Sequence, residues 1–526
     1  MKKRDLFHSA SATVTVMILA TLLSKALGLV RQMMTAGIFA ASMEGVAFSA
    51  ASKIPLAIFD MLFSTAIVGA FLPIYKGGLT SDPARAKRFS SSFLTAVTLV
   101  TAAVSLFGVL FSKPLLLICA PDLNAETLAL AETLLRIMFP SMIFAGAAYT
   151  LVGISQSHES FILPALVSAV SNLVLIVYLA FCPTPADKNA AIGLAFAYLI
   201  SWMAQFLTLA VPLLQKKHFP APTLQLKNTE LSLALRRSLP VMFGSWLAPM
   251  TTLIANAFSS FVPSETIEAG SADGAAIVIY ENAFSVFSIA SGLIVYGVCN
   301  YIFPKLSARV ASKDDEGFSQ LIKNGLFASL ALVLPIAVFL FLLSEEIVTF
   351  LYMRGAFTAG LTDAAARSLK ILSLAMPFYS VTELLSRVCY SAGKVRLPML
   401  SSLAGIAAAL LSSSLFLLSG KLSVETVALT STLAIFSAAF TLTLLTFSHF
   451  RGVIRVDSKK SVPLLFAGCA LSGISMWFCK SILTHFLNFS HTFQNFITIA
   501  IVFAVGFVVY LLWLIMTRLV KADMFR

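Results

Sequence analysis

Long apolar segments alternate with short polar ones along nearly the whole chain. Most of these segments reach the roughly 20 residues that a helix needs to cross the hydrocarbon core of a bilayer. They lack the alternating pattern of about 10 residues that marks an outer-membrane strand. The pattern predicts an all-α polytopic membrane protein with about 14 transmembrane helices. The expected spans are 12–40, 45–76, 88–118, 124–155, 160–182, 190–215, 232–262, 272–303, 317–343, 361–392, 397–419, 425–448, 461–482 and 493–517.

Composition excludes a soluble protein of this length. Hydrophobic residues make up 58% of the 526 residues and charged residues only 12%, whereas soluble domains carry about 25% charged residues. The net charge of +13 does not indicate nucleic-acid binding, because the basic residues follow the membrane topology. No nucleic-acid partner is therefore expected.

The loops between spans carry Lys and Arg asymmetrically. With the N-terminus in the cytoplasm, most loop Lys and Arg fall on the cytoplasmic side, as the positive-inside rule requires. This asymmetry predicts an even number of spans in a bacterial cytoplasmic membrane, with both termini inside. The few basic residues on the opposite side are Lys113, Lys188, Arg354, Lys421 and Lys480.

Prolines recur near span ends at an offset of about 234 residues, which indicates an internal repeat. The offset corresponds to six spans, so the repeats are parallel and predict two six-helix lobes in a V, typical of an alternating-access transporter. The expected domains are 1–218, 219–455 and a pair of additional helices with a cytoplasmic tail in 456–526. The proline pairs are Pro73 with Pro304, Pro140 with Pro377 and Pro164 with Pro398.

Several ionisable residues lie inside the expected spans, where each costs about 2.5–3.5 kcal/mol unless it faces a cavity or a partner. Lys53 and Asp60 are seven positions apart and share a helix face. Glu383 and Arg387 are four apart and are expected to pair with each other. The other intramembrane charges considered as site residues are Lys25, Arg31 and Glu281.

The basic residues of the first lobe favour an anionic substrate. Lys25, Arg31 and Lys53 would line a cationic cavity between the lobes, and phosphate groups bind such side chains well. The alternative, that some of these side chains extend to the membrane interface, stays open.

No motif indicates an enzyme or a bound cofactor. The chain has no phosphate-binding GxxxxGK[ST] loop, no HExxH and no GxSxG. Its six cysteines are scattered and form no CxxC pair, so neither a metal centre nor a disulfide framework is predicted.

Short motifs in a fixed order resemble those of the MurJ (MviN) family. These are lipid II flippases of the multidrug/oligosaccharidyl-lipid/polysaccharide superfamily. Ser24 to Arg31 reads SKALGLVR and resembles the motif of the family's first helix. The other resembling segments are the KIP and AFLP of 53–73, LIANAFSSF at 253–261, RGAFT at 354–358 and ELLSR at 383–387.

The chain departs from the family pattern at a few positions. Phe59, Asp60 and Ser64 stand where the second helix usually has an arginine and a glutamate, and Gln32 replaces an acidic residue. Glu281 lies where the eighth helix usually has a cavity arginine. Two arginines expected to hold a diphosphate are therefore missing.

The resemblance implies a flippase that moves undecaprenyl-diphosphate-linked peptidoglycan precursor, lipid II, from the inner to the outer leaflet by alternating access. It implies membrane lipids and cell-wall synthesis machinery as partners, and coupling to membrane potential or to a monovalent cation gradient. Asn256 is the candidate for ion coupling. The implied substrate contacts are Ser24, Lys25, Arg31 and Lys53, with Asp60 and Glu281 added from the charge analysis.

Three other functions stay open at this stage. The missing arginines favour a flippase for another lipid-linked oligosaccharide. A cation or drug antiporter of the same fold would use Asp60 and Glu281 as carboxylates. A non-transporting scaffold of a wall-synthesis complex would not need Arg31 or Lys53 at all.

Overall fold

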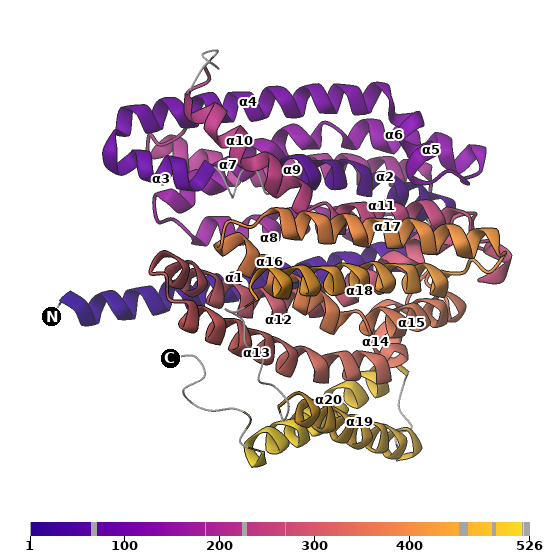
Figure 1. The fold of residues 1–526 in the computed structure, drawn as a ribbon. Helices are drawn as coiled ribbons and strands as arrows, with labels where there is room; N and C mark the ends of the chain where they lie inside the picture. Colours follow the sequence, from indigo (N-terminus) through magenta and orange to yellow (C-terminus); the bar gives the residue numbers. More distant parts are fainter. Residues whose placement is uncertain are drawn as a thin grey trace. The chain divides into compact units, whose positions relative to one another are not determined.

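The computed structural model describes residues 2–64, 71–184, 186–223, 229–268, 270–451, 461–486, 491–517 and 519. Within these ranges the regular structure is entirely helical (Figure 1). Side-chain caps explain where many helices begin: Ser42, Asp82 and Asn124 each accept a hydrogen bond from a backbone N–H of the first turn. The predicted all-α class is confirmed.

The chain packs as two compact units. Unit 1 is Met1–Ser260 with Ser271–Val278, and unit 2 is Phe261–Gly270 with Ile279–Arg526. Unit 1 contains α1 (Lys2–Phe39), α2 (Met43–Phe59), the π-helix η1 (Asp60–Ser64), α3 (Leu72–Ser81), α4 (Pro83–Leu110), α5 (Ser112–Cys119), α6 (Ala125–Met138), α7 (Ser141–Ser157), α8 (Ile162–Ala180), α9 (Lys188–Gln215), α10 (Thr229–Gly244) and α11 (Leu247–Ser260).

Unit 2 holds most of α12 and every later helix. Its last two helices, α19 and α20, form a hairpin drawn in yellow in Figure 1. The elements are the 3-10 turn η3 (Ser264–Thr266), α12 (Ala275–Ala311), α13 (Asp315–Leu342), α14 (Ser344–Tyr352), α15 (Ala359–Ser373), α16 (Met376–Ser391), α17 (Arg396–Leu418), α18 (Val424–His449), α19 (Ser461–Phe486) and α20 (His491–Met516).

This division by packing differs from the domains expected from the sequence. Helices α10 and α11 pack with unit 1, although the expected second lobe begins at 219. Helices α19 and α20 pack with unit 2 instead of forming a third part. The lobe boundaries at 218 and 455 stay predictions.

In the described residues, 11 helices are long and apolar enough to cross a membrane. They match expected spans 2 to 6, 8, 9 and 11 to 14. The seventh span is divided into α10 and α11, and the tenth into α15 and α16. The count of about 14 helices stays a prediction.

Proline explains two of the helix breaks. Pro140 separates α6 from α7, and Pro377 stands in the first turn of α16, directly after the break from α15. A proline lacks the N–H that would continue the helix, and its ring clashes with the carbonyl four residues earlier. These prolines form one of the repeat pairs, so the corresponding span is broken in each unit.

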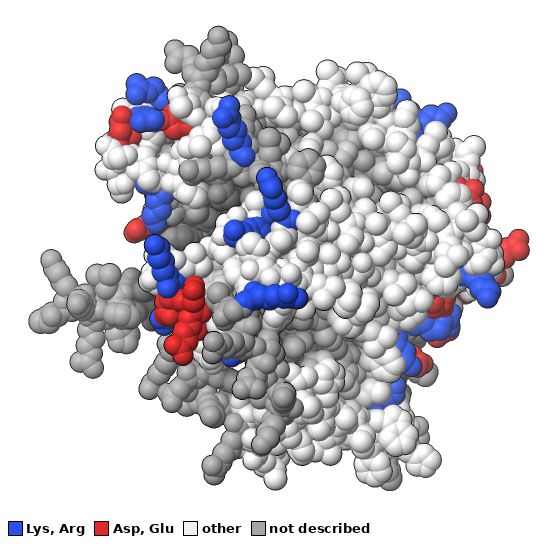
Figure 2. Space-filling model, viewed as in Figure 1, with Lys and Arg blue, Asp and Glu red and all other residues white. Residues whose placement is uncertain are grey.

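The ends of the helices carry most of the charged side chains. On the face drawn in Figure 2, Lys, Arg, Asp and Glu gather at the helix ends and leave the sides of the helices uncharged. Large apolar side chains such as Leu411 of α17, 73% exposed, and Ile474 of α19, 65% exposed, lie within the helices and away from their ends. This distribution suits a lipid environment.

Two histidines stack where α7 and α9 end. The His158 and His218 rings lie 3.9 Å apart at an angle of 6°, and the Tyr75 hydroxyl lies 3.2 Å from His158 Nε2. Both helices end in a left-handed residue, Glu159 and Lys217, each with φ of 59°. Helix C-termini attract positive charge, so the protonation state of this pair affects the junction.

Acid is expected to weaken this junction. Burial and the nearby His218 and Lys216 lower the pKa of His158 below its ordinary 6.5. Below pH 6.5 the unfolded chain therefore binds a proton at His158 more readily than the folded chain does. The free energy of unfolding consequently falls as the pH drops through the folded pKa of His158. We expect the melting midpoint to fall more on acidification for wild type than for His158→Gln; equal falls would contradict this reading.

Candidate functional site

Small residues let α1 lie close against α8. The Ser24 hydroxyl donates to Ala165 O at 3.2 Å, and Asn172 Nδ2 donates to Ser24 O at 3.1 Å. A Cβ on Gly28 would lie 3.3 Å from Asn172 Nδ2, so a larger residue would press on α8. Ser24 is buried in this contact, and its predicted role as a substrate contact stays a prediction.

The predicted lysines are the more accessible site residues of unit 1. Lys25 follows Ser24 on α1 and is exposed, while Lys53 on α2 is half-buried. Their roles as substrate contacts stay predictions. The exposed ammonium group of Lys25 is accessible to a phosphate, which suits reversible binding.

Arg31 and Asp60 both lie within electrostatic range of the Tyr198 hydroxyl of α9, inside unit 1. Both charges interact electrostatically with that hydroxyl, which also hydrogen-bonds the Trp202 side chain. Asp60 acts in the same way on Tyr149 of α7. Four helices or helix segments thus contribute to one polar cluster.

Aromatic packing holds this cluster in place. The Phe59 ring, next to Asp60, lies 5.1 Å from the Tyr149 ring and 6.4 Å from the Trp202 ring. Phe59 is almost fully buried. Tyr149, Tyr198 and Trp202 were not predicted from the sequence. The available signal was that polar aromatic residues in apolar spans need partners for their hydroxyl or N–H groups.

Two irregular helix segments meet beside the cluster. The π-helix η1 interrupts the second span, and such segments often occur at functional sites. The seventh span breaks at Ser245 and Trp246, because Pro249 in the first turn of α11 cannot donate to the Ser245 carbonyl. Trp246 Nε1 donates to Met61 O at 3.1 Å and so joins the break to η1.

Asn256 lies buried on α11. Its side chain is 2% exposed, and in the described part of the chain its Nδ2 has no hydrogen-bond partner. The same holds for Ser259 Oγ, one turn further along α11. An amide nitrogen donates and does not ligate cations, so Asn256 as an ion-coupling residue stays a prediction. No group of three His, Cys, Asp or Glu residues with metal-binding geometry occurs among the described residues.

The predicted residues of unit 2 lie on α12 and α16. Glu281 is half-buried on α12, directly after Tyr280, whose hydroxyl lies 2.8 Å from Ser431 Oγ of α18. Glu281 as a substrate contact stays a prediction. Glu383 and Arg387 approach to 3.9 Å on α16, so the expected pair is confirmed.

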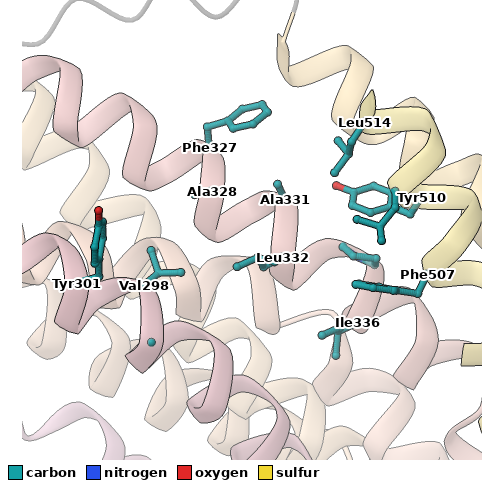
Figure 3. Close-up of a pocket in the computed structure, with 13 residues that line it drawn as sticks. Val298, Tyr301, Phe327, Ala328, Ala331, Leu332, Ile336, Phe507, Tyr510 and Leu514 are labelled. Carbon is teal, nitrogen blue, oxygen red and sulfur yellow. The ribbon is translucent and has the colours of Figure 1, made fainter. Parts of the chain in front are cut away.

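Unit 2 also contains an apolar cavity of about 710 Å³. Helices α12, α13 and α20 line it, and Figure 3 shows Val298, Leu332 and Phe507 around the space. Carbon atoms form nearly all of its wall. Such a cavity favours an aliphatic ligand and offers little to a charged one. This cavity was not predicted, because uniform hydrophobicity along a sequence does not reveal where helices leave space between them.

Comparison with known proteins places the chain beside one family. The family model described as lipid II flippase MurJ matches residues 35–497. A relative from Bdellovibrio bacteriovorus, described as a probable lipid II flippase MurJ, is 28% identical over 393 residues, which cover 74% of this chain and 73% of the relative. A protein of the same description from Buchnera aphidicola subsp. Schizaphis graminum is 27% identical over 388 residues, 73% of each chain.

Solved structures show the same fold. A structure described as the lipid II flippase MurJ in an inward closed conformation matches with a TM-score of 0.78 and 22% identity, over 96% of this chain and 99% of that chain. An inward-facing multidrug resistance MATE transporter of the MOP superfamily matches with a TM-score of 0.68 and 12% identity, over 84% and 98% of the two chains. At these identities the matches speak for the fold alone.

The Trp246 contact can be tested by deleting its donor alone. Trp246→Phe keeps an aromatic ring but removes the N–H, so we expect the free energy of unfolding to fall by about 1 kcal/mol. Amide hydrogen exchange in η1 should become faster. Trp477→Phe, at a ring that is 59% exposed on α19, serves as the matched control. Unchanged exchange in η1 would show that the indole bond does not hold this segment.

Proposed function

Because the chain belongs to the MurJ family of lipid II flippases, we propose that Lys25, Arg31 and Lys53 bind the diphosphate of lipid II during its passage across the membrane. The chain is a multi-pass membrane protein of a flippase family, and lipid II is its substrate. The match of the family model over residues 35–497 carries this function.

The charges of unit 1 support the assignment of the diphosphate contacts. Lys25 is exposed, so its ammonium group is accessible to a ligand, and Lys53 is half-buried on α2. Arg31 lies deeper, beside Tyr198 and within the electrostatic reach of the cluster that contains Asp60. A guanidinium group in such a position can exchange a carboxylate partner for a phosphate group. Both partners present oxygen acceptors that the same guanidinium N–H groups can bind.

Asp60 would then regulate the strength of diphosphate binding. A carboxylate near Arg31 competes with an anionic ligand and so favours release. Glu281, in unit 2, is proposed to act on the substrate in the same way. These two residues stand in place of the arginines that the resemblance predicts, and Ser24 is proposed to act through the packing of α1 on α8.

The apolar cavity of unit 2 is proposed to receive the isoprenoid tail of lipid II. The tail is a long hydrocarbon chain, and the cavity offers about 710 Å³ lined almost entirely by carbon (Figure 3). Because the surrounding lipid is as apolar as the cavity, dispersion contacts and shape, and not transfer out of water, would favour the tail there. Headgroup and tail would thus be bound by different parts of the chain with different chemistry.

Orientation and driving force complete the proposal. The excess of Lys and Arg in alternate loops supports a chain with both termini in the cytoplasm. An inside-negative membrane potential then drives an anionic headgroup outward, with about 2.3 kcal/mol for each elementary charge at 100 mV. A monovalent cation gradient acting at Asn256 is the alternative coupling. Cell-wall synthesis proteins stay predicted partners.

The diphosphate contacts are tested by complementation of a conditional lipid II flippase mutant. We expect wild type to restore growth, and Arg31→Ala or Lys53→Ala to lose at least about tenfold in rescue efficiency at matched membrane expression, since each removes one charged contact worth about 1.4 kcal/mol or more. Lys421→Ala, in a loop between α17 and α18, is the control. Full rescue by both Arg31→Ala and Lys53→Ala would refute this assignment. Failure of wild type to restore growth at good expression would indicate that the substrate is a different lipid-linked oligosaccharide.

The tail pocket is tested by filling it. Ala331→Trp places a large ring in the cavity beside Leu332, so a long-tailed polyprenyl diphosphate should bind more weakly while a short-tailed analogue keeps its affinity. Leu403→Trp, at an exposed position of α17, is the control for added bulk. Binding to purified protein in nanodiscs measures both ligands, and an equal affinity for the two tails in wild type would rule the pocket out.

A further inference from the structure

A single lysine ties α19 to the junction of α13 and α14. Lys480 Nζ lies 2.7 Å from Glu346 Oε1 and donates to Leu342 O at 3.1 Å. The Glu346 residue is 8% exposed. Lys480 is the only Lys, Arg, Asp or Glu in α19, and α20 has none. In Figure 1 these helices form a pair next to α13 and α14.

Local helix electrostatics explain why a lysine suits this place. Leu342 is the last residue of α13, and its carbonyl lies at the negative end of that helix. Glu346 lies in the first turn of α14, at the positive end of that helix. The Lys480 ammonium therefore neutralises one helix end while it pairs with the carboxylate that stabilises the next.

The pair with Lys480 engages only one of the two oxygens of Glu346. Glu346 Oε2 has no hydrogen-bond partner among the residues that the structure describes. A lysine on a lipid-facing helix costs about 2.5–3.5 kcal/mol at the membrane centre and less toward the interface. Moving α19 away from the junction would separate two partly buried charges, so the pair favours one position of the helix.

The two helices of the hairpin move together. Ser472 Oγ donates to Gly506 O and Trp513 Nε1 donates to Leu464 O, each at 2.8 Å. These bonds join α19 and α20 at two levels. A tether on α19 therefore also fixes α20, which has no charge of its own.

Helix α20 forms one wall of the apolar cavity, through residues that include Phe507, Tyr510 and Leu514 (Figure 3). Its contacts with α13 and α14 include aromatic pairs such as Phe339 with Phe503, whose rings lie 5.0 Å apart. Apolar contacts tolerate sliding, whereas an ion pair with a directional hydrogen bond specifies one register.

We propose that Lys480 is a positioning residue for tail binding: its ion pair with Glu346 and its bond to Leu342 O fix the α19–α20 hairpin so that α20 closes the apolar cavity against α12 and α13. This inference rests on the proposed function, because it assumes that the cavity receives the isoprenoid tail. Lys480 itself touches no substrate and acts through the hairpin.

The first experiment measures how binding depends on tail length. Undecaprenyl diphosphate and geranyl diphosphate are the probes, with purified protein in nanodiscs. Because Lys480→Met alone leaves Glu346 buried and unpaired, the principal variant is Lys480→Met with Glu346→Gln, which removes both charges. We expect the double variant to lose about tenfold in affinity for the long tail and to bind the short one as wild type does.

Matched variants separate charge from bulk. Lys480→Arg keeps the cation and should retain most of the long-tail affinity, whereas Lys421→Met removes an exposed lysine elsewhere in unit 2 and should change neither affinity. A double variant that keeps the wild-type preference for the long tail would overturn the positioning role. A wild type without any preference would instead refute the tail pocket itself, so the two failures are distinguishable.

A cross-link tests whether Lys480 acts by holding the α19–α20 hairpin in position. A Cβ built on Gly473 of α19 lies 3.1 Å from Val338 Cγ1 of α13, an approach that suits a disulfide between Val338→Cys and Gly473→Cys. Both substitutions are made in the double variant, with the six native cysteines replaced by alanine. Oxidation should restore the long-tail affinity and reduction should abolish it. A cross-link that forms without restoring affinity would overturn the proposal.

Discussion

The hydrocarbon environment imposes the constraint on which the rest of this structure depends: a polar group that leaves water must find its partner within the protein. A continuous helix meets this requirement for its own backbone, which explains the all-helical architecture. Where a helix is interrupted, another group has to compensate. At the π-helix η1, the indole of Trp246 bonds the Met61 carbonyl, and at the end of α13 the ammonium of Lys480 bonds the Leu342 carbonyl.

Much of the fold could be predicted because the same constraint leaves a pattern in the sequence. Apolar runs of sufficient length located the helices that cross the membrane, and Pro140 and Pro377 were recognised as a repeat pair, although the breaks beside them were not predicted. The division of the seventh span was missed. Its cause, Pro249 in the first turn of α11, is visible in the sequence, but a proline near a span end also occurs without a break, as Pro304 within α12 illustrates.

The site was less predictable, because it depends on contacts between distant segments. Charge alone selected Arg31 and Asp60, but it did not reveal that both act on the Tyr198 hydroxyl. The apolar cavity left no trace in composition, since its lining resembles any other lipid-facing surface. Family membership identifies the substrate. Which residues bind its anionic headgroup and which bind its apolar tail depends on the chemistry of individual side chains.

The exchange of segments between the two units has a consequence for how the chain can be divided. Residues 261–270 follow α11 but belong to unit 2, where Glu268 bonds Thr358. Ser271–Val278 then belong to unit 1, where Ala272 N donates to Ala41 O at 3.1 Å. No single cut therefore yields two fragments that each contain a whole unit. During synthesis, unit 1 lacks its last segment until the ribosome has reached Val278, and by then residues 261–270 of unit 2 have already been made.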